Sequence, residues 1–431
     1  MSLTFRRALF AFFSFLFLVV GSAIVLYGLG WRINPYTFKI QKTGAIAIQT
    51  EPRGVIIKIG KKEFADKSSI IQNHTLIPDL LPETYQVSIE KDGYRSYRKT
   101  ITVRPSLVET INAVLLPSQL KTEIVIQPIK GNVIVDIYAD ENKFIIQNSA
   151  NGIFYLYNLN NSKTALNITA LASNIETPDK AGVGKIEKAA FLPFDSNRLL
   201  IETASGLKIL DTNRLQIENI TDGKVLTWSL KNSTIYFAKA KKEDKNITSI
   251  FSYDLVFKTQ NNVLDISSTT AKLPLKSIKA SGLKNKIAFL DFAGGLFIFT
   301  PNASMPKKIA HSVKLFEFAP NSKAIAFLDN DGAIGVEFTD NWDSAFRKKP
   351  GDVSRFNLTE KQNMEKIKWY FDSLRLFASK NNEISLMEID DREPLNIYKI
   401  ESGFNDFFYD GNNSFVYFIK DGKLRKTNIE S

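Results

Sequence analysis

Seven polar or charged residues recur inside apolar segments of the last three hundred residues of the chain. They are Asp136, Lys188, Thr227, Lys279, Glu317, Lys368 and Asp406. Carboxylates and lysines that converge on one pocket with perturbed pKa values could perform acid–base catalysis. The same mixture of charges could equally line a channel that binds a ligand. Which of these chemistries is available depends on the elements that position the seven side chains.

The usual catalytic and metal-binding motifs are absent from the 431 residues. With no cysteine, the chain has no disulfide, thiolate zinc site or cysteine nucleophile. Its two histidines, His74 and His311, cannot form a three-histidine metal site. No Walker-type loop, GxGxxG after a strand, HExxH or GxSxG occurs. The sequence therefore predicts a non-catalytic protein without a resident metal or cofactor.

The chain from Ser118 to Ser431 repeats with a mean period of about 45 residues, which is typical of the four-stranded blades of a β-propeller. Each unit has an apolar strand, a polar turn, a second apolar strand and a Gly or Asn turn. Seven segments are predicted to be the innermost strands: Val133 to Tyr138, Glu187 to Leu192, Val225 to Leu230, Lys276 to Gly282, Val313 to Ala319, Glu365 to Phe371 and Phe404 to Asp410. Seven blades are expected, and six remain the alternative if one unit is misassigned.

One version of the repeat, Phe318-Ala-Pro-Asn-Ser-Lys-Ala-Ile-Ala-Phe327, is similar to an element of TolB-like and WD40-like propellers. This version lacks the Gly-His and Trp-Asp signatures of true WD40 repeats. The last unit ends after its third strand, Lys423 to Ile429, whereas residues 120–127 form an extra strand before the first unit. An open sheet edge favours aggregation. We therefore expect residues 120–127 to complete the seventh blade of a domain that covers residues 118–431.

Residues 42–117 show the alternation of short strands separated by turns and predict a small antiparallel β-sandwich. The stretch from Gly44 through Pro52-Arg53-Gly54-Val55, with Tyr85-Gln-Val-Ser-Ile-Glu-Lys-Asp-Gly-Tyr94, resembles a PEGA domain. The turn that gives this family its name, Pro-Glu-Gly-Ala, here reads Pro-Arg-Gly-Val. The resemblance implies an extracytoplasmic bacterial surface module that brings no catalytic residues.

Residues 1–32 predict a cytoplasmic tip followed by a membrane-spanning signal-anchor. The run from Ala8 to Gly30 is uncharged, and as a helix it would be about 33 Å long, enough to cross a bilayer. The residues assigned to the anchor and its flanks are Arg6, Arg7, Leu9, Phe13, Leu16, Val20, Ile24, Tyr27, Trp31 and Arg32. A cleaved signal peptide, with Gly21-Ser22-Ala23 as the cleavage site, is the alternative.

Arg6 and Arg7 favour a cytoplasmic N-terminus, with the bulk of the chain outside the cytoplasmic membrane. The net charge of +11 suits an anionic partner, but the basic residues are scattered and no nucleic-acid-binding motif occurs. The sequence thus predicts a mainly β protein of the bacterial envelope, in which a single-pass anchor and a PEGA-like spacer present a propeller. The expected partner is an envelope protein or an anionic cell-wall or surface glycan, and the alternative function is an envelope hydrolase or lyase.

Overall fold

The computed structural model describes residues 3–35, 37–68, 73–160, 162–175, 184–244, 246–300, 303–356 and 364–430. The chain forms two compact units. The first consists of residues 1–119 together with the segments 343–347 and 392–396. The second consists of residues 120–342, 348–391 and 397–431.

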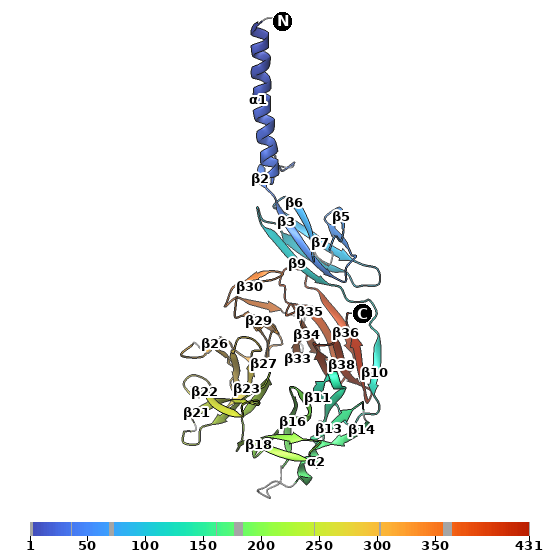
Figure 1. Cartoon of the computed structure of the whole chain (residues 1–431), viewed down its shortest axis with the longest axis vertical. Coiled ribbons are helices and arrows are strands. Elements are labelled where there is room, and N and C mark those ends of the chain that lie inside the picture. The colour runs from blue at the N-terminus through green and yellow to red at the C-terminus, as the bar shows by residue number, and fades with distance from the viewer. Residues whose placement is uncertain are drawn as a thin grey trace. The chain divides into compact units, whose positions relative to one another are not determined.

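The first unit begins with helix α1 (Leu3–Gly28), which is apolar on all sides and has no buried residue (Figure 1). Its most apolar part has a mean hydropathy of 2.7, and it is the one helix among the described residues that is long and apolar enough to cross a membrane. The helix starts before the predicted uncharged run and includes Arg6 and Arg7. Its length and position are those of a membrane anchor or of a signal sequence.

A short hairpin that the sequence did not predict follows the helix. Strand β1 (Trp31–Ile33) pairs with β2 (Ile40–Lys42). The guanidinium of Arg32 lies 3.5 Å from the ring centre of Tyr27 and donates to the Tyr27 carbonyl oxygen at 2.6 Å. Arg32 also forms an ion pair with Asp79 at 2.8 Å. Trp31 and Arg32 therefore belong to a strand that is attached to the end of the helix.

The rest of the first unit contains two sheets around one apolar core, as expected of a small sandwich. One sheet has the order β6 (Thr75–Leu80), β3 (Gly44–Glu51), β9 (Val108–Val114). The other has the order β5 (Lys62–Ala65), β4 (Ile56–Ile59), β7 (Thr84–Glu90), β8 (Tyr97–Thr102). Alternate residues of the strands, among them Ile46, Ile57 and Ile89, are fully buried between them.

The expectation that all pairs in this sandwich are antiparallel was wrong for one of them. Strands β3 and β9 run parallel, with Ala45 opposite Val108 and Glu51 opposite Val114. The chain passes through the second sheet before it returns as β9, and this crossover brings β9 back in the direction of β3. Hairpin turns alone do not reveal such a return.

The outer edge of β8 is covered by the segment 392–396, which belongs to the same unit. The Thr100 amide donates to the Glu393 carbonyl oxygen at 2.8 Å. The side-chain amide of Asn396 accepts from the Arg98 amide at 3.0 Å and donates to the Arg98 carbonyl oxygen at 2.8 Å. These bonds satisfy backbone groups that an open edge would leave unpaired.

The second unit is a seven-bladed β-propeller, in which seven four-stranded sheets form a ring (Figure 1). Blade 1 contains β11 (Val133–Tyr138), β12 (Lys143–Asn148), β13 (Ile153–Asn158) and β14 (Ser162–Asn167). Blade 2 contains β15 (Ile186–Leu192), β16 (Asp195–Thr203), β17 (Gly206–Asp211) and β18 (Gln216–Asp222). Blade 3 contains β19 (Thr227–Lys231), β20 (Thr234–Ala240), β21 (Ile247–Asp254) and β22 (Thr259–Ser267). Blade 4 contains β23 (Leu275–Ala280), β24 (Ile287–Asp291), β25 (Leu296–Phe299) and β26 (Lys307–Ala310); blade 5 contains β27 (Val313–Phe318), β28 (Ala324–Asp329), β29 (Ile334–Phe338) and β32 (Val353–Phe356). Blade 6 contains β33 (Met364–Trp369), β34 (Arg375–Lys380), β35 (Glu383–Glu388) and β36 (Ile397–Ser402); blade 7 contains β37 (Phe407–Asp410), β38 (Phe415–Lys420), β39 (Lys423–Asn428) and β10 (Thr122–Ile126).

Three short elements lie between these strands. A 3₁₀ turn (Ala139–Glu141) precedes β12, and helix α2 (Ile168–Asn174) follows β14. Strands β30 (Trp342–Asp343) and β31 (Arg347–Lys348) form a two-stranded sheet in the connection between β29 and β32.

Blade 7 is assembled from both ends of the propeller sequence. Strand β10 pairs antiparallel with β39, with Glu123 opposite Lys426. The Thr427 hydroxyl donates to the Lys121 carbonyl oxygen at 2.9 Å. Ile126 is buried beside Tyr417 and Leu424. The fourth strand of the last blade thus comes from the segment that precedes the first blade.

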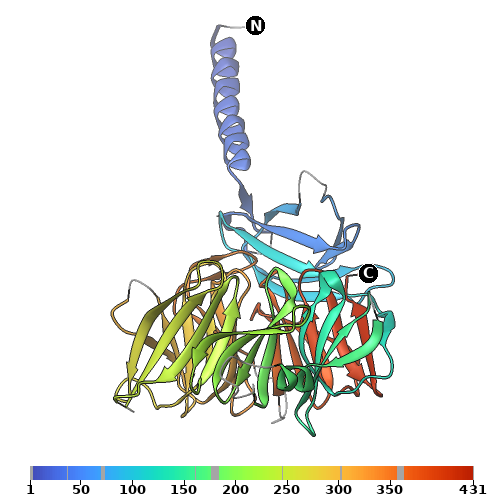
Figure 2. The same cartoon turned by 60° about the horizontal axis from the view of Figure 1, so that its bottom comes forward.

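Apolar side chains fill the space between neighbouring blades, which stand side by side in Figure 2. Ile145 and Phe154 of blade 1 pack against Ile186 and Phe191 of blade 2. Leu290 of blade 4 belongs to a cluster with Phe316 and Phe327 of blade 5. The core of the unit is therefore a series of sheet-to-sheet contacts around the ring.

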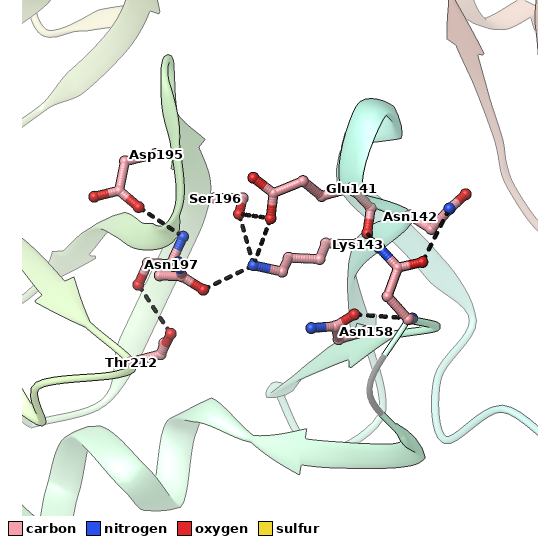
Figure 3. A network of polar contacts seen from close by, with 9 residues as sticks. Glu141, Asn142, Lys143, Asn158, Asp195, Ser196, Asn197 and Thr212 are labelled. Carbon is pink, nitrogen blue, oxygen red and sulfur yellow. Dashed lines mark hydrogen bonds and ion pairs between the residues drawn. The ribbon is translucent and has the colours of Figure 1, made fainter.

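A buried lysine joins blades 1 and 2 (Figure 3). The ammonium of Lys143, at the start of β12, donates to Ser196 Oγ at 2.6 Å and to Asn197 Oδ1 at 2.7 Å. It pairs with Glu141 at 3.0 Å, and the Ser196 hydroxyl donates to the same carboxylate at 2.5 Å. Only 6% of the Lys143 side chain is exposed. The charge is thus compensated by groups from the first turns of both blades.

Candidate functional site

Two levels of side chains on the inner strands include five of the seven residues selected from the sequence. In blades 1, 2, 4, 5 and 6 the pairing of the inner strand with the second strand shifts by one residue near its start. Such β-bulges redirect the side chains that follow. The residues directly after the shift form the first level: Asp136, Lys188, Ser277, Leu315 and Lys366. Because side chains alternate along a strand, the second level lies two residues later: Tyr138, Ala190, Lys279, Glu317 and Lys368.

Three residues of the second level form one ion cluster across blades 4, 5 and 6. The Glu317 carboxylate lies 2.5 Å from Lys279 Nζ and 2.8 Å from Lys368 Nζ. Burial opposes the ionisation of Glu317, but the two ammonium groups together outweigh it and lower the pKa to about 2. Burial lowers the pKa of Lys279, whereas the attraction of Glu317 raises that of Lys368. The carboxylate is therefore ionised and fully paired at neutral pH.

Asp406, from the start of blade 7, is paired with a lysine that the sequence analysis did not select. Lys366 Nζ lies 3.0 Å from Asp406 Oδ1 and donates to the Phe407 carbonyl oxygen at 2.6 Å. Asp406 Oδ2 accepts from the Ile134 amide of blade 1 at 2.9 Å. Burial lowers the pKa of Lys366. Lys366 could have been found from its spacing, since it precedes Lys368 by two residues and so lies on the same face of the strand.

Among the described residues, Asp136 forms no direct ion pair, and backbone amides hold its carboxylate instead. Its two carboxylate oxygens accept from the amides of Ile137 at 2.9 Å and Phe191 at 2.8 Å. Burial raises the pKa of Asp136 to about 6, against the effect of these two bonds and of the Lys368 charge. Asp136 therefore titrates closer to neutrality than an ordinary aspartate.

Lys188 and Thr227 come from blades 2 and 3 and line the same cavity as Lys279 and Glu317. Lys188 Nζ is 3.5 Å from the buried carboxylate of Glu202, and half of the lysine side chain remains exposed. Trp228 Nε1 donates to the same carboxylate at 2.7 Å, which fixes the indole. Thr227 is buried at the start of β19. The structure thus places five of the seven selected residues in three ion-paired groups, while Asp136 and Thr227 belong to none of them. The groups are Lys279, Glu317 and Lys368; Asp406 with Lys366; and Lys188 with Glu202.

A cavity of about 340 Å³ opens between the inner strands of blades 2, 3, 4 and 5. Its lining includes Lys188, Trp228, Ser229, Lys231 and Lys276. A second cavity of about 270 Å³, toward blade 1, shares Lys188 and Trp228 with it. The same cavity is also lined by Ser277, Lys279 and Glu317, so it borders the Glu317 cluster.

The cavity carries cations and a hydroxyl without partners. Among the described residues, Lys231 and Lys276 form no ion pair within 4.0 Å, and both are exposed. The buried Ser229 hydroxyl has no hydrogen-bond partner in the same part of the chain. Positive charge beside a free hydroxyl and an indole can bind a carboxylate or phosphate carried on a larger polar molecule. The sequence analysis missed Lys231 and Lys276. Their only local signal is their position, since Lys231 ends the inner strand β19 and Lys276 lies at the start of the inner strand β23.

Metal-ligand groups do not gather in the described part of the chain: no set of three or more His, Asp or Glu side chains there could hold a metal ion. The remaining acidic groups of the channel are held by lysines or backbone amides.

Comparison with known proteins matches a family model to part of the chain and finds solved structures of similar fold. Residues 43–119 match the family model of the PEGA domain. No curated protein matches the sequence. Among solved structures, an oligogalacturonate lyase from Vibrio parahaemolyticus aligns with a TM-score of 0.51 and 11% identity, over 72% of this chain and 94% of the lyase. An oligogalacturonate lyase in complex with manganese aligns with a TM-score of 0.48 and 10% identity, over 80% of this chain and 96% of that one. At this identity the first of these similarities shows the propeller fold alone.

Proposed function

We propose that this protein is a non-catalytic, membrane-anchored binding protein of the bacterial envelope, whose propeller channel binds an anionic glycan. The observation that carries the proposal is the cavity with Lys231, Lys276 and the unpartnered Ser229 hydroxyl. Cations without a protein counterion are available to an incoming anion, and the neighbouring Trp228 offers an aromatic face to a sugar ring. An acidic protein segment is the alternative occupant.

The ion clusters favour binding over catalysis. A general base must be free to take a proton, and its pKa must lie near the working pH. Glu317 is clamped between two ammonium groups and its pKa is lowered to about 2. Asp136 has a raised pKa, but both its oxygens already accept backbone N–H groups. An envelope lyase or hydrolase, the second candidate in the sequence analysis, would need another proton acceptor.

The first unit supports the proposed location of the protein. Helix α1 has the length and hydropathy of a membrane span, and Arg6 and Arg7 at its start favour a cytoplasmic N-terminus. The PEGA domain that follows supports an extracytoplasmic position for the rest of the chain. In this proposal α1 is an uncleaved anchor and the PEGA domain is a spacer.

Ligand binding is tested with the full chain in detergent micelles, using oligogalacturonate as the acidic glycan, a neutral oligosaccharide of equal length and poly-glutamate. We expect oligogalacturonate to bind, and binding to weaken as the salt concentration rises. The double variant Lys231→Gln, Lys276→Gln should weaken binding by about tenfold or more, since each lost charge contact contributes on the order of 1 kcal/mol. The control double variant Lys121→Gln, Lys224→Gln removes the same charge from exposed positions elsewhere.

Three outcomes would overturn the proposal in distinguishable ways. Equal loss in both double variants would mean that net charge, and not the cavity, attracts the glycan. Preference for poly-glutamate would identify an acidic protein segment as the occupant. Turnover of oligogalacturonate into unsaturated products would show a lyase. Anchoring is tested separately: full-length protein that washes off bacterial membranes at alkaline pH, or a mature N-terminus near residue 24, would contradict it.

A further inference from the structure

One face of the propeller carries all the turns between first and second strands and between third and fourth strands of the blades. In a four-stranded antiparallel sheet these two turns lie at the same end. Contacts between blades confirm the common face: Asn232 Nδ2 donates to the Gly282 carbonyl oxygen at 3.2 Å, and Lys258 of blade 3 pairs with Glu218 of blade 2 at 2.6 Å. We refer to this side as the first-turn face.

Six large apolar side chains protrude from the first-turn face of blades 2, 3 and 4. They are Phe194 (83% exposed), Leu215 (52%), Val256 (68%), Phe257 (78%), Leu283 (73%) and Met305 (70%), which follows β25. Phe194 follows β15 and Leu215 follows β17, whereas Val256 and Phe257 follow β21 and Leu283 follows β23. Single exposed apolar residues are ordinary, but several on adjacent turns of one face indicate a contact surface.

Two of these residues also have an unfavourable backbone conformation. Phe194 has a φ of 71° and Leu215 a φ of 55°, in the left-handed region where Gly or Asn costs less. The turn at Leu215 is held by Asp211 Oδ1, which accepts the amides of Asn213 and Arg214. Asp254 holds the turn at Phe257 in the same way. The turns thus fix apolar side chains in exposed positions where neither burial nor backbone conformation favours them.

Cations outnumber carboxylates in two ion clusters beside these turns. Glu218 is shared by Arg198 at 3.0 Å and Lys258 at 2.6 Å. Asp340 is shared by Lys284 at 3.2 Å and Lys286. The same turns also carry Asp195, Asp211 and Asp254, so carboxylates there balance the cations. Exposed apolar side chains among charged groups are typical of surfaces that bind the interfacial region of a membrane.

The space between the turns offers little to an apolar partner segment. Leu215 lines a cavity of about 710 Å³ on this face, but the lining is dominated by polar groups such as Asp195, Arg198 and Gln216. A protein partner that inserted an apolar anchor would need an apolar slot there. Separate exposed apolar side chains around a polar cavity are better suited to insertion between lipid headgroups.

We propose that Phe194, Leu215, Val256, Phe257 and Leu283 insert into the headgroup region of the bilayer, so that the propeller docks on the membrane by its first-turn face. This inference rests on the proposed anchoring by α1, which would keep the propeller close to a bilayer and raise the effective concentration of this contact. Docking of this kind would hold the channel in a fixed orientation toward the membrane surface.

The absence of native cysteine makes a clean labelling experiment possible. The full chain is reconstituted in vesicles of phosphatidylcholine and phosphatidylglycerol, with one cysteine labelled by an environment-sensitive dye. Asn213→Cys places the dye on the first-turn face of blade 2, and Ala204→Cys places it on the opposite face of the same blade. We expect the dye at 213 to be quenched by nitroxide lipids and to be at least about twofold less quenched by iodide than the dye at 204, because the headgroup region excludes the ion.

A second variant separates insertion from mere proximity. Leu215→Ser, Val256→Ser and Phe257→Ser, added to the Asn213→Cys chain, should return the dye to water, whereas Phe292→Ser, an exposed residue of blade 4 on the other face, should not. Equal iodide quenching at 213 and 204 overturns the proposal. Protection at 213 that rises with protein density at constant lipid, and is seen in detergent as well, would indicate contact between copies and overturn it too. Resistance of the same samples to alkaline extraction reports on α1 alone, so the two proposals fail separately.

Discussion

Glu317 of blade 5 and Lys279 of blade 4 form an ion pair 2.5 Å long across the channel wall. Lys368 of blade 6 completes the cluster at 2.8 Å, so that one carboxylate joins three blades. Removal of one partner from such a pair leaves the other charges without compensation.

Glu317→Gln should therefore destabilise the propeller by about 2 kcal/mol, less than for a fully buried pair because a fifth to a third of these side chains is exposed. Urea denaturation followed by tryptophan fluorescence measures the change. The matched control is Glu123→Gln, which removes an exposed carboxylate 3.5 Å from Lys426 and should cost less than about 0.5 kcal/mol. Equal effects would contradict a structural role for the Glu317 cluster.

Glu317 also predicts a dependence of stability on acid pH. Its pKa in the folded state is lowered from the ordinary 4.5 to about 2, so the ionised form is favoured by folding. This stabilisation is present above the unfolded-state pKa and is lost as the pH falls through the folded-state pKa. Between pH 4.5 and 2 the free energy of unfolding of the wild type should fall more steeply than that of Glu317→Gln.

For Asp136 we expect a dependence of stability on pH with the opposite sign. Burial raises its pKa from 3.8 to about 6, so folding favours the protonated form. The contribution of Asp136 to stability should decrease as the pH rises from about 4 to about 6. Asp136→Asn, which cannot titrate, should make the free energy of unfolding less dependent on pH in this window, as measured by urea denaturation in a series of buffers. An unchanged slope would show that Asp136 is accessible to water and titrates normally.

We expect the loss of the Lys143 bridge between blades 1 and 2 to lower the stability of the propeller. Lys143→Met would leave Ser196, Asn197 and Glu141 without their common donor, and should cost about 2 kcal/mol, because hydrogen bonds to a charged group contribute more than neutral ones. Thermal unfolding measures the loss. Lys224→Met, at an exposed position, should leave the melting temperature within about 1 °C of the wild type.

Ring closure is tested on strand β10. Ile126→Asn places a polar group among Tyr417, Ile419 and Leu424, and should destabilise blade 7 by about 3 kcal/mol. The freed edge of β39 should also promote association between molecules, which light scattering detects. Ile124→Asn, on the same strand but about half exposed, should have little effect on either measurement.

The inner strands of the propeller could be predicted because they combine apolar alternation with a polar turn on each side. Their pairing register could not, because the bulges at Asp136, Lys188 and Lys366 depend on the second strand of each blade. The residues selected from the sequence therefore come from two levels of the channel, and Lys366 was missed. Lys231 and Lys276 could not be selected from the sequence, because only the folded propeller brings both lysines to the lining of one cavity.

The first unit shows the same limit. The sandwich follows from alternation and turns, and residues 43–119 match the PEGA model. The parallel pairing of β3 with β9 arises from the crossover through the second sheet, which no local pattern records. The hairpin of β1 and β2 carries Arg32, which contacts Tyr27 nearby in sequence and Asp79 47 positions away, and no local pattern records the second contact.

The union of β10 with β39 has a consequence for biosynthesis. Lys121 and Thr427 are 306 positions apart, and their strands become neighbours only after nearly all of the intervening polypeptide has been made. Until then, the growing chain has an unpaired sheet edge at each end of the incomplete ring of blades. Closure of the propeller ring is therefore a late step in the folding of the chain, because an unpaired sheet edge remains exposed until β39 is available.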